Sequence, residues 1–132
     1  RVLSHHQTPL SGLAAYIRQL GGIRDKALPS RACMLVKSLL ELGAREQAAL
    51  EKVELLLVGM ETRFIECFKK AQQIGEIDSK LDAVRLGRRL QAEVMGLRAF
   101  AQRDVDSAAI HNLAEDMASS IEALRLDHSA KA

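Results

Sequence analysis

Histidines, the side chains best suited to bind metals or move protons near neutral pH, are few in this sequence. His5 and His6 are adjacent but have no third ligand near them, so we interpret them as part of a polar lead-in over residues 1–7. His111 and Glu115 are spaced to share a helix face, as a ligand or acid–base pair would be, but a solvated pair is the simpler interpretation. The Glu-x-x-His pattern of metal-binding helical bundles does not occur. The sequence therefore predicts no catalytic residue, no metal site and no cofactor.

Cysteines and clustered arginines are the other groups that could do chemistry. Cys33 and Cys67 lie in apolar stretches of helical spacing, which indicates two buried free thiols in a reducing compartment, with a disulfide as the alternative. Arg85, Arg88 and Arg89 could contact phosphate, but they flank an apolar stripe, as the solvated edge of a helix does. Lys and Arg exceed Asp and Glu by only two (19 against 17), and the basic residues are scattered. We therefore expect no DNA binding by this chain alone.

The composition of the whole chain is typical of one all-helical domain. Of its 132 residues 48% are apolar, enough for a core of its own, and only 2 are prolines, which would interrupt helices. Good helix formers outnumber Val, Ile and Thr. No apolar run approaches the roughly 20 residues of a membrane helix and no signal peptide opens the chain, so we expect a cytoplasmic protein without membrane contact. Because the chain begins with Arg1, we expect a fragment, a processed chain or a chain that lacks its N-terminus.

Apolar residues spaced by three and four predict five helices in a domain over residues 8–126, followed by a polar tail over 127–132. Thr8 with Pro9 is the first start signal, and Asp78 and Asp106 are the expected N-caps of the last two helices. The predicted helices cover residues 9–20, 30–43, about 45–74, about 79–102 and 107–125. This spacing is typical of helices packed roughly antiparallel in a bundle.

Three short motifs occur in order along the chain: Ala32-Cys33-Met34-Leu35-Val36 followed by Glu41-Leu42, then Ala71-Gln72-Gln73-Ile74-Gly75-Glu76-Ile77, then Val94-Met95-Gly96-Leu97. Together with the helix lengths, they resemble the C-terminal effector-binding and dimerisation domain of TetR/AcrR-family transcriptional regulators over residues 9–125. The sequence departs from that family in having Ala32 where glycine is usual, and in lacking the N-terminal helix-turn-helix domain. The resemblance implies a parent protein that contacts DNA only through the missing domain.

The last two predicted helices are the expected dimer interface. The resemblance implies a homodimer in which these helices from both subunits form a four-helix bundle. Their apolar stripes also offer more surface than a single antiparallel pair covers, and the small residues Ala92, Gly96 and Ala99 would let two backbones approach closely. The residues expected at the interface are Leu90, Ala92, Val94, Gly96, Leu97, Ala99, Ile110, Ala114, Met117, Ile121 and Leu124.

In that family, the long helix and the helices before it surround an effector cavity. The resemblance therefore favours a pocket for a small apolar effector among the first three predicted helices of this chain. The expected ligand-binding residues are Tyr16, Ile17, Met34, Met60, Phe64 and Phe68. Plain core packing of the phenylalanines and methionines is the alternative, and the hydroxyl of Tyr16 would be the polar contact of a pocket. The rival function is a stand-alone dimerisation or adaptor module without a ligand. A third hypothesis is that the chain is a metal-dependent enzyme with a helical-bundle fold.

Overall fold

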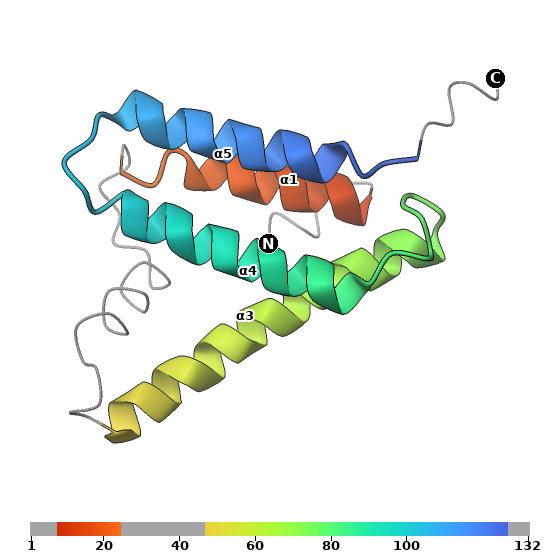
Figure 1. Ribbon diagram of the computed structural model, residues 1–132, viewed down its shortest axis with the longest axis horizontal. Coiled ribbons are helices and arrows are strands. Elements are labelled where there is room, and N and C mark those ends of the chain that lie inside the picture. Colours follow the sequence, from red (N-terminus) through yellow and green to blue (C-terminus); the bar gives the residue numbers. More distant parts are fainter. Residues whose placement is uncertain (1–7, 25–46, 127–132) are drawn as a thin grey trace.

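The computed structural model describes residues 8–24 and 47–126, which contain four α-helices and no β-strand (Figure 1). These helices are α1 (Pro9–Leu20), α3 (Gln47–Gln73), α4 (Ala83–Phe100) and α5 (Ser107–Glu122). The all-helical prediction is confirmed for this part of the chain. None of the described helices is long and apolar enough to cross a membrane. The helix predicted over residues 30–43, the lead-in over 1–7 and the tail over 127–132 lie outside the described residues.

Two helices begin at the side chains that were predicted to cap them. The backbone N–H of Ser11 donates to the Thr8 hydroxyl at 3.1 Å, and Pro9 occupies the first position of α1, where its missing N–H is not needed. Asp106 accepts a hydrogen bond from the backbone N–H of Ala109 at 3.2 Å at the start of α5. These local hydrogen bonds fix both starts because they satisfy N–H groups that have no partner within the helix.

The start of α4 differs from the prediction, which placed it near residue 79 with Asp78 as its cap. Asp78 instead accepts from the backbone N–H of Lys80 at 2.9 Å, in a turn. Asp82 caps the helix, accepting from the N–H groups of Val84 and Arg85 at 3.0 and 3.2 Å. An aspartate hydrogen-bonds equally readily to the backbone of a turn and of a helix start, so the sequence offered two similar candidates.

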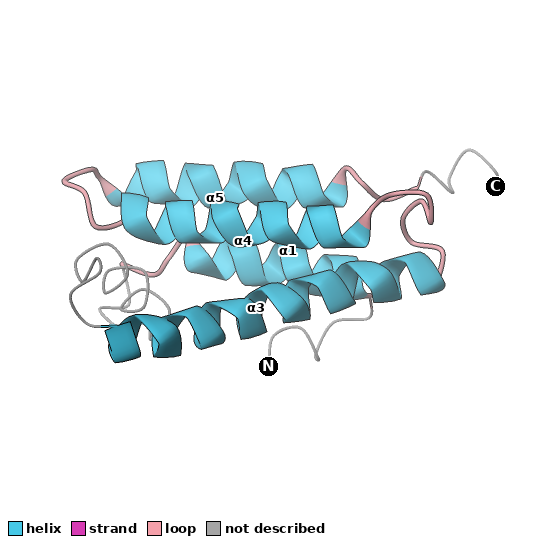
Figure 2. Ribbon diagram, turned by 60° about the horizontal axis from the view of Figure 1, so that its bottom comes forward, coloured by secondary structure: helices cyan, strands magenta, loops and turns pink. Residues whose placement is uncertain are grey.

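The helices pack in two closely contacting pairs. α3 packs mainly on α4, and α1 mainly on α5, whereas α4 and α5 touch each other less although they are consecutive. Figure 1 shows α1, α4 and α5 running alongside one another while α3 crosses them obliquely. In Figure 2, α3 and α5 lie on opposite sides, with α1 and α4 between them. The arrangement leaves the open side of the α4–α5 pair without a further described helix.

The contact between α3 and α4 depends on Gly87. A Cβ atom at this position would lie 2.3 Å from Cγ1 and 2.9 Å from the backbone N of Ile65, so only glycine allows the two helices to approach this closely. The large side chains that are almost completely buried in the core come from both helix pairs and from the turn after α3. They are Leu10, Leu13, Ile17, Phe68, Ile77, Val94 and Ile110.

Two arginines fix α1 and the turn that follows it. The Arg18 guanidinium forms ion pairs with two carboxylates of α5, Glu115 at 2.9 Å and Glu122 at 2.7 Å. Arg24 donates hydrogen bonds to carbonyl oxygens at the end of α4 and in the following loop, those of Ala101, Arg103 and Val105. Arg24 therefore satisfies carbonyl groups that the end of α4 leaves open.

Glu76 fixes the start of α1. Its carboxylate is buried and accepts a hydrogen bond from the backbone N–H of Leu10 at 3.0 Å. The other carboxylate oxygen pairs with Arg125 at 3.3 Å, and the carbonyl oxygen of Glu76 accepts from the N–H of Leu126 at 2.9 Å. A negative charge at a helix N-terminus is also favoured by the helix dipole. One residue thus joins the start of α1, the turn after α3 and the segment after α5.

Candidate functional site

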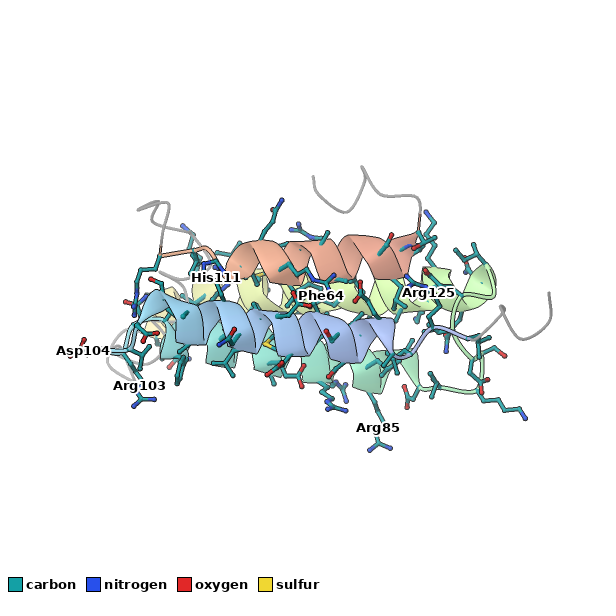
Figure 3. All side chains as sticks on the ribbon, turned by 90° about the horizontal axis from the view of Figure 1, so that it is seen from above. Phe64, Arg85, Arg103, Asp104, His111 and Arg125 are labelled. Atoms are coloured by element: carbon teal, nitrogen blue, oxygen red, sulfur yellow. The ribbon has the colours of Figure 1, made fainter. Side chains whose placement is uncertain are left out.

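Tyr16 and Phe64, two of the predicted ligand-binding residues, form an aromatic pair between α1 and α3. Their ring centroids are 6.0 Å apart and the ring planes are inclined by 52°, a geometry that aromatic pairs favour. Phe64 is only 4% exposed, and Figure 3 shows it inside the bundle. Ile17 is completely buried in the same core, whereas Met60 of α3 is half-buried. The structure therefore brings Tyr16, Ile17 and Phe64 together.

The other two predicted ligand-binding residues are placed differently. Phe68 lies one turn beyond Phe64 on α3, is 1% exposed, and faces the space between α4 and α5. Met34 lies outside the described residues. A stripe of apolar residues along one helix can face two different neighbours in turn, and for this reason the sequence grouped Phe68 with the Tyr16 side.

Two buried polar residues of α4 accompany the aromatic pair, and the sequence analysis missed both. An Nη atom of Arg98 donates to the Tyr16 hydroxyl at 3.2 Å, and Arg98 is only 4% exposed. Gln91 is 5% exposed, and its side-chain N–H donates to the carbonyl oxygen of Leu57 at 3.1 Å. The two residues follow Leu90 and Leu97 directly and are spaced by seven, so they share one side of α4. The spacing of seven residues, directly after two leucines of the buried apolar stripe, was the signal that could have identified them.

Six of the predicted interface residues are buried within the single chain. Their side chains are covered by α3 and α1 or by the facing sides of α4 and α5, and each is at most 5% exposed: Leu90, Val94, Leu97, Ile110, Ala114 and Ile121. Two of these six residues, Leu90 and Ile121, also line a groove between α4 and α5. The sequence shows that a stripe is buried but does not show which neighbour buries it. The dimer itself stays a prediction.

The other five predicted interface residues lie nearer the surface. Ala92 and Gly96 are exposed and Ala99 is half-buried, all on the side of α4 that faces away from the core. A Cβ atom at Gly96 would meet no atom within 4 Å, so the described part of the chain leaves space there. Met117 and Leu124 of α5 are half-buried against the edge of the core.

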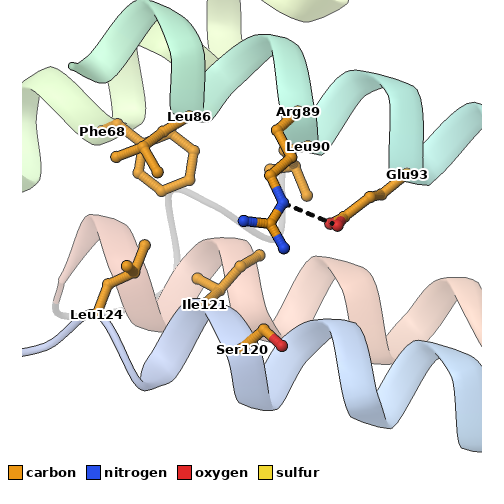
Figure 4. Close-up of a pocket in the computed structure, with 8 residues that line it drawn as sticks. All are labelled: Phe68, Leu86, Arg89, Leu90, Glu93, Ser120, Ile121 and Leu124. Carbon is orange, nitrogen blue, oxygen red and sulfur yellow. Dashed lines mark hydrogen bonds and ion pairs between the residues drawn. The ribbon is translucent and has the colours of Figure 1, made fainter. Parts of the chain in front are cut away.

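A shallow groove lies between α4 and α5 (Figure 4). Apolar side chains line most of it, and its polar edge holds Ser120 and the ion pair between Arg89 and Glu93, whose atoms are 3.2 Å apart. The apolar lining residues are Phe68, Leu86, Leu90, Ile121 and Leu124. The groove has a volume of about 60 Å³. Sites for small molecules commonly have about 300–1,000 Å³, so this groove suits the end of a side chain better than a whole effector.

The charged residues singled out in the sequence are mostly engaged in ion pairs at the surface. Arg88 lies 3.6 Å from Glu61, and Arg89 pairs with Glu93, while Arg85 extends away from the bundle in Figure 3. These arginines therefore form a solvated, pairing edge, as expected. No cluster of three potential metal ligands occurs among residues 8–24 and 47–126.

The contacts of Glu115 and the burial of Cys67 indicate structural roles for both side chains. The hydrogen bonds from Arg18 lower the pKa of Glu115, so this carboxylate serves the contact between α1 and α5 rather than a pair with His111. Cys67 is half-buried, and burial raises the pKa of its thiol, which favours the protonated form. Cys67 is a free cysteine, and Cys33 lies outside the described residues.

Comparison with known proteins finds no family model that matches this chain, no similar curated protein and no similar solved structure. Function is therefore inferred from the residues and their contacts alone.

Proposed function

We propose that this chain is the effector-binding and dimerisation domain of a cytoplasmic TetR-type transcriptional regulator, and that its effector is a small, largely apolar molecule. The observation that carries this proposal is the contact between Tyr16 of α1 and Phe64 of α3 beside two buried polar side chains of α4. Aromatic rings offer contact area to an apolar ligand, and a few polar groups fix its orientation. The three motifs of the sequence, and the order of α3, α4 and α5, support the family assignment.

The effector acts, in this proposal, through α1. Tyr16 is on this short helix, whose start follows the segment that would lead from the DNA-reading domain of the parent protein. An effector that binds one position of α1 more tightly than another shifts the population of dimers whose DNA-reading domains fit the operator. Because the basic residues of the chain are scattered and nearly balanced by acidic ones, the isolated chain should not retard operator-length duplex DNA at physiological salt.

Thermal-shift screening of apolar and aromatic compounds, with the wild type and Phe64→Ala, tests effector binding. A fully packed core phenylalanine costs about 3–5 kcal/mol when truncated to alanine. If Phe64 lines a ligand site, Phe64→Ala should destabilise the chain by less than this and should weaken binding of the compounds that stabilise the wild type. Phe68→Ala is the matched control, because Phe68 is 1% exposed in the core and should show the full cost.

Two outcomes of this screen would contradict effector binding. The first is a full loss of stability in Phe64→Ala, equal to that of Phe68→Ala. The second is the absence of any compound that stabilises the wild type. Together they would favour the rival function, a dimerisation or adaptor module without a ligand.

The dimer is proposed to form through the outer side of the α4–α5 pair, with a second copy of this chain as the occupant of the groove. The groove is apolar and accepts a side-chain end, which is how one helix packs on another. Leu113 lies on the same side of α5, seven residues before Ser120 at the edge of the groove, and it is 37% exposed. Leu90, Ile121 and Leu124, which the sequence analysis predicted at the interface, line this groove.

Sedimentation velocity at micromolar concentration tests the dimer. We expect the wild type to sediment as a dimer and Leu113→Glu to sediment as a monomer, because an unpaired charge would be buried at the interface. Leu55→Glu is the control, since Leu55 lies on α3, away from the groove, and is 74% exposed. A monomeric wild type, or a Leu113→Glu variant that remains a dimer, would contradict the proposed interface.

A further inference from the structure

Gln91 carries a buried acceptor atom that the fold does not use. Its side-chain nitrogen donates to the carbonyl oxygen of Leu57, and its side-chain oxygen, Oε1, is buried without a hydrogen-bond partner in the part of the chain that the structure describes. The amide cannot be turned over, because Oε1 would then face the Leu57 carbonyl oxygen and both atoms are acceptors. The position of Oε1 is therefore fixed by the bond on the nitrogen side.

The hydrogen bond that Gln91 does make adds little to the fold. Leu57 is an interior residue of α3, and the carbonyl oxygen of an interior helical residue already accepts the N–H four residues further on. In contrast, a buried acceptor without a partner is destabilising, and such groups in folded proteins call for a specific explanation. A methionine of similar length would avoid this penalty, so packing alone does not explain a glutamine here.

Gln91 joins α4 to α3, the helix that carries Phe64 of the aromatic pair. Arg98, two turns further along the same side of α4, donates to the Tyr16 hydroxyl. Leu57 lies seven residues before Phe64, and both are buried, so they share the inner side of α3. The separation along the helix axis is about 10 Å at 1.5 Å per residue, and helical side chains tilt towards the N-terminus, which brings the Phe64 ring nearer to Leu57. An aromatic body of about two rings matches this separation.

We propose that Oε1 of Gln91 accepts a hydrogen bond from a hydroxyl or N–H group of the effector, whose aromatic body lies against Tyr16 and Phe64. The ligand class is thus an aromatic alcohol or amine of about two rings. An ether or a tertiary amine of the same shape lacks the donor and leaves Oε1 unsatisfied. A carboxylate is repelled by the lone pairs of Oε1. This inference rests on the proposed function, because it names the chemistry of the same effector.

The first arm of the test needs no ligand. Gln91→Met removes the unsatisfied acceptor, so we expect the melting temperature of the unliganded chain to rise by about 2–4 °C. Gln72→Met is the matched control, because the side chain of Gln72 donates to the carbonyl oxygens of Asp78 and Leu81 and its loss should lower the melting temperature. A lower melting temperature in Gln91→Met would show a structural role and overturn the inference.

The second arm compares probe pairs that differ only in the donor: 2-naphthol with 2-methoxynaphthalene, indole with N-methylindole, and 4-phenylphenol with 4-methoxybiphenyl. Isothermal calorimetry with the wild type should show about tenfold tighter binding of the donor in at least one pair, and Gln91→Met should remove the preference. Equal binding of both members of every pair that binds overturns the role of Gln91 but leaves effector binding intact. Binding of no probe by the wild type counts against effector binding itself and overturns the inference with it.

Discussion

Replacing Gly87 by alanine tests how tightly α3 and α4 are packed. The added Cβ would lie 2.3 Å from Cγ1, 2.9 Å from the backbone N and 3.0 Å from Cα of Ile65. Rotation of the Ile65 side chain relieves the first contact, but the other two involve backbone atoms and can be relieved only if the helices move apart. Carbon atoms prefer separations of about 3.5–4.0 Å, so the required movement is a few tenths of an ångström or more.

The magnitude follows from two opposing effects. Alanine is about 1 kcal/mol better than glycine in a helix interior, whereas overpacking of a close contact costs about 1–3 kcal/mol. Because backbone atoms are involved, we expect the larger cost to prevail and Gly87→Ala to lose about 1–2 kcal/mol. Gly96→Ala is the matched variant in the same helix. Its Cβ would meet no atom within 4 Å, so it should gain about 0.5–1 kcal/mol.

Urea unfolding followed by far-UV circular dichroism measures both variants against the wild type. We expect their unfolding free energies to differ by about 1.5–3 kcal/mol, with Gly87→Ala the less stable. A Gly87→Ala variant as stable as Gly96→Ala would refute the close approach of α3 and α4. Destabilisation by Gly96→Ala would instead show that the second subunit of the proposed dimer packs closely on Gly96.

Two further predictions concern the polar contacts of α1. Hydrogen bonds from Arg18 lower the pKa values of Glu115 and Glu122 in the folded chain. These carboxylates therefore stabilise the fold above the unfolded pKa of about 4.3, and the stabilisation is lost as the pH falls through their lower pKa values in the folded state. The unfolding free energy of Arg18→Met, measured from pH 7 to pH 3, should therefore decline less steeply than that of the wild type, and parallel curves would argue against this ion-pair network. Glu76→Ala removes the acceptor at the start of α1 and the partner of Arg125, so we expect a loss of about 1–3 kcal/mol and faster amide hydrogen exchange in the first turn of α1. Unchanged exchange there would mean that Glu76 does not hold the start of this helix.

The helices of the described residues were predictable where the signal is local. Thr8 with Pro9, Asp106 and Gly75 mark helix ends through hydrogen bonds or backbone angles of neighbouring residues; Gly75, for example, has φ 76° at the end of α3. The regular stripe of α3 gave its extent to within about two residues, as expected for helix ends. Asp82 was missed in favour of Asp78 because both are short carboxylates before an apolar run.

The partners of the buried stripes were not predictable from the sequence. Val94 and Ile110 were correctly identified as members of apolar stripes, and both are buried inside the single chain by neighbouring helices, which their spacing alone did not indicate. Gln91 and Arg98 were missed because a polar residue beside an apolar stripe normally lies at the surface, whereas here Gln91 bonds to α3 and Arg98 bonds to Tyr16 of α1. Helix periodicity describes one helix, whereas burial depends on how several helices cross.

The position of α1 connects the proposed ligand site with the rest of the domain. This helix is held at its start by Glu76, near its end by the ion pairs of Arg18, and just beyond its end by Arg24. Tyr16 lies between the first and second of these contacts and touches both Phe64 of α3 and Arg98 of α4. Since a short helix with several fixed points moves as a unit, a ligand that separates Tyr16 from Phe64 either moves the whole of α1 or breaks one of its polar contacts. Breaking the contact at Glu76 would release the start of α1, and the proposed regulator would then transmit effector binding through the segment that precedes residue 8.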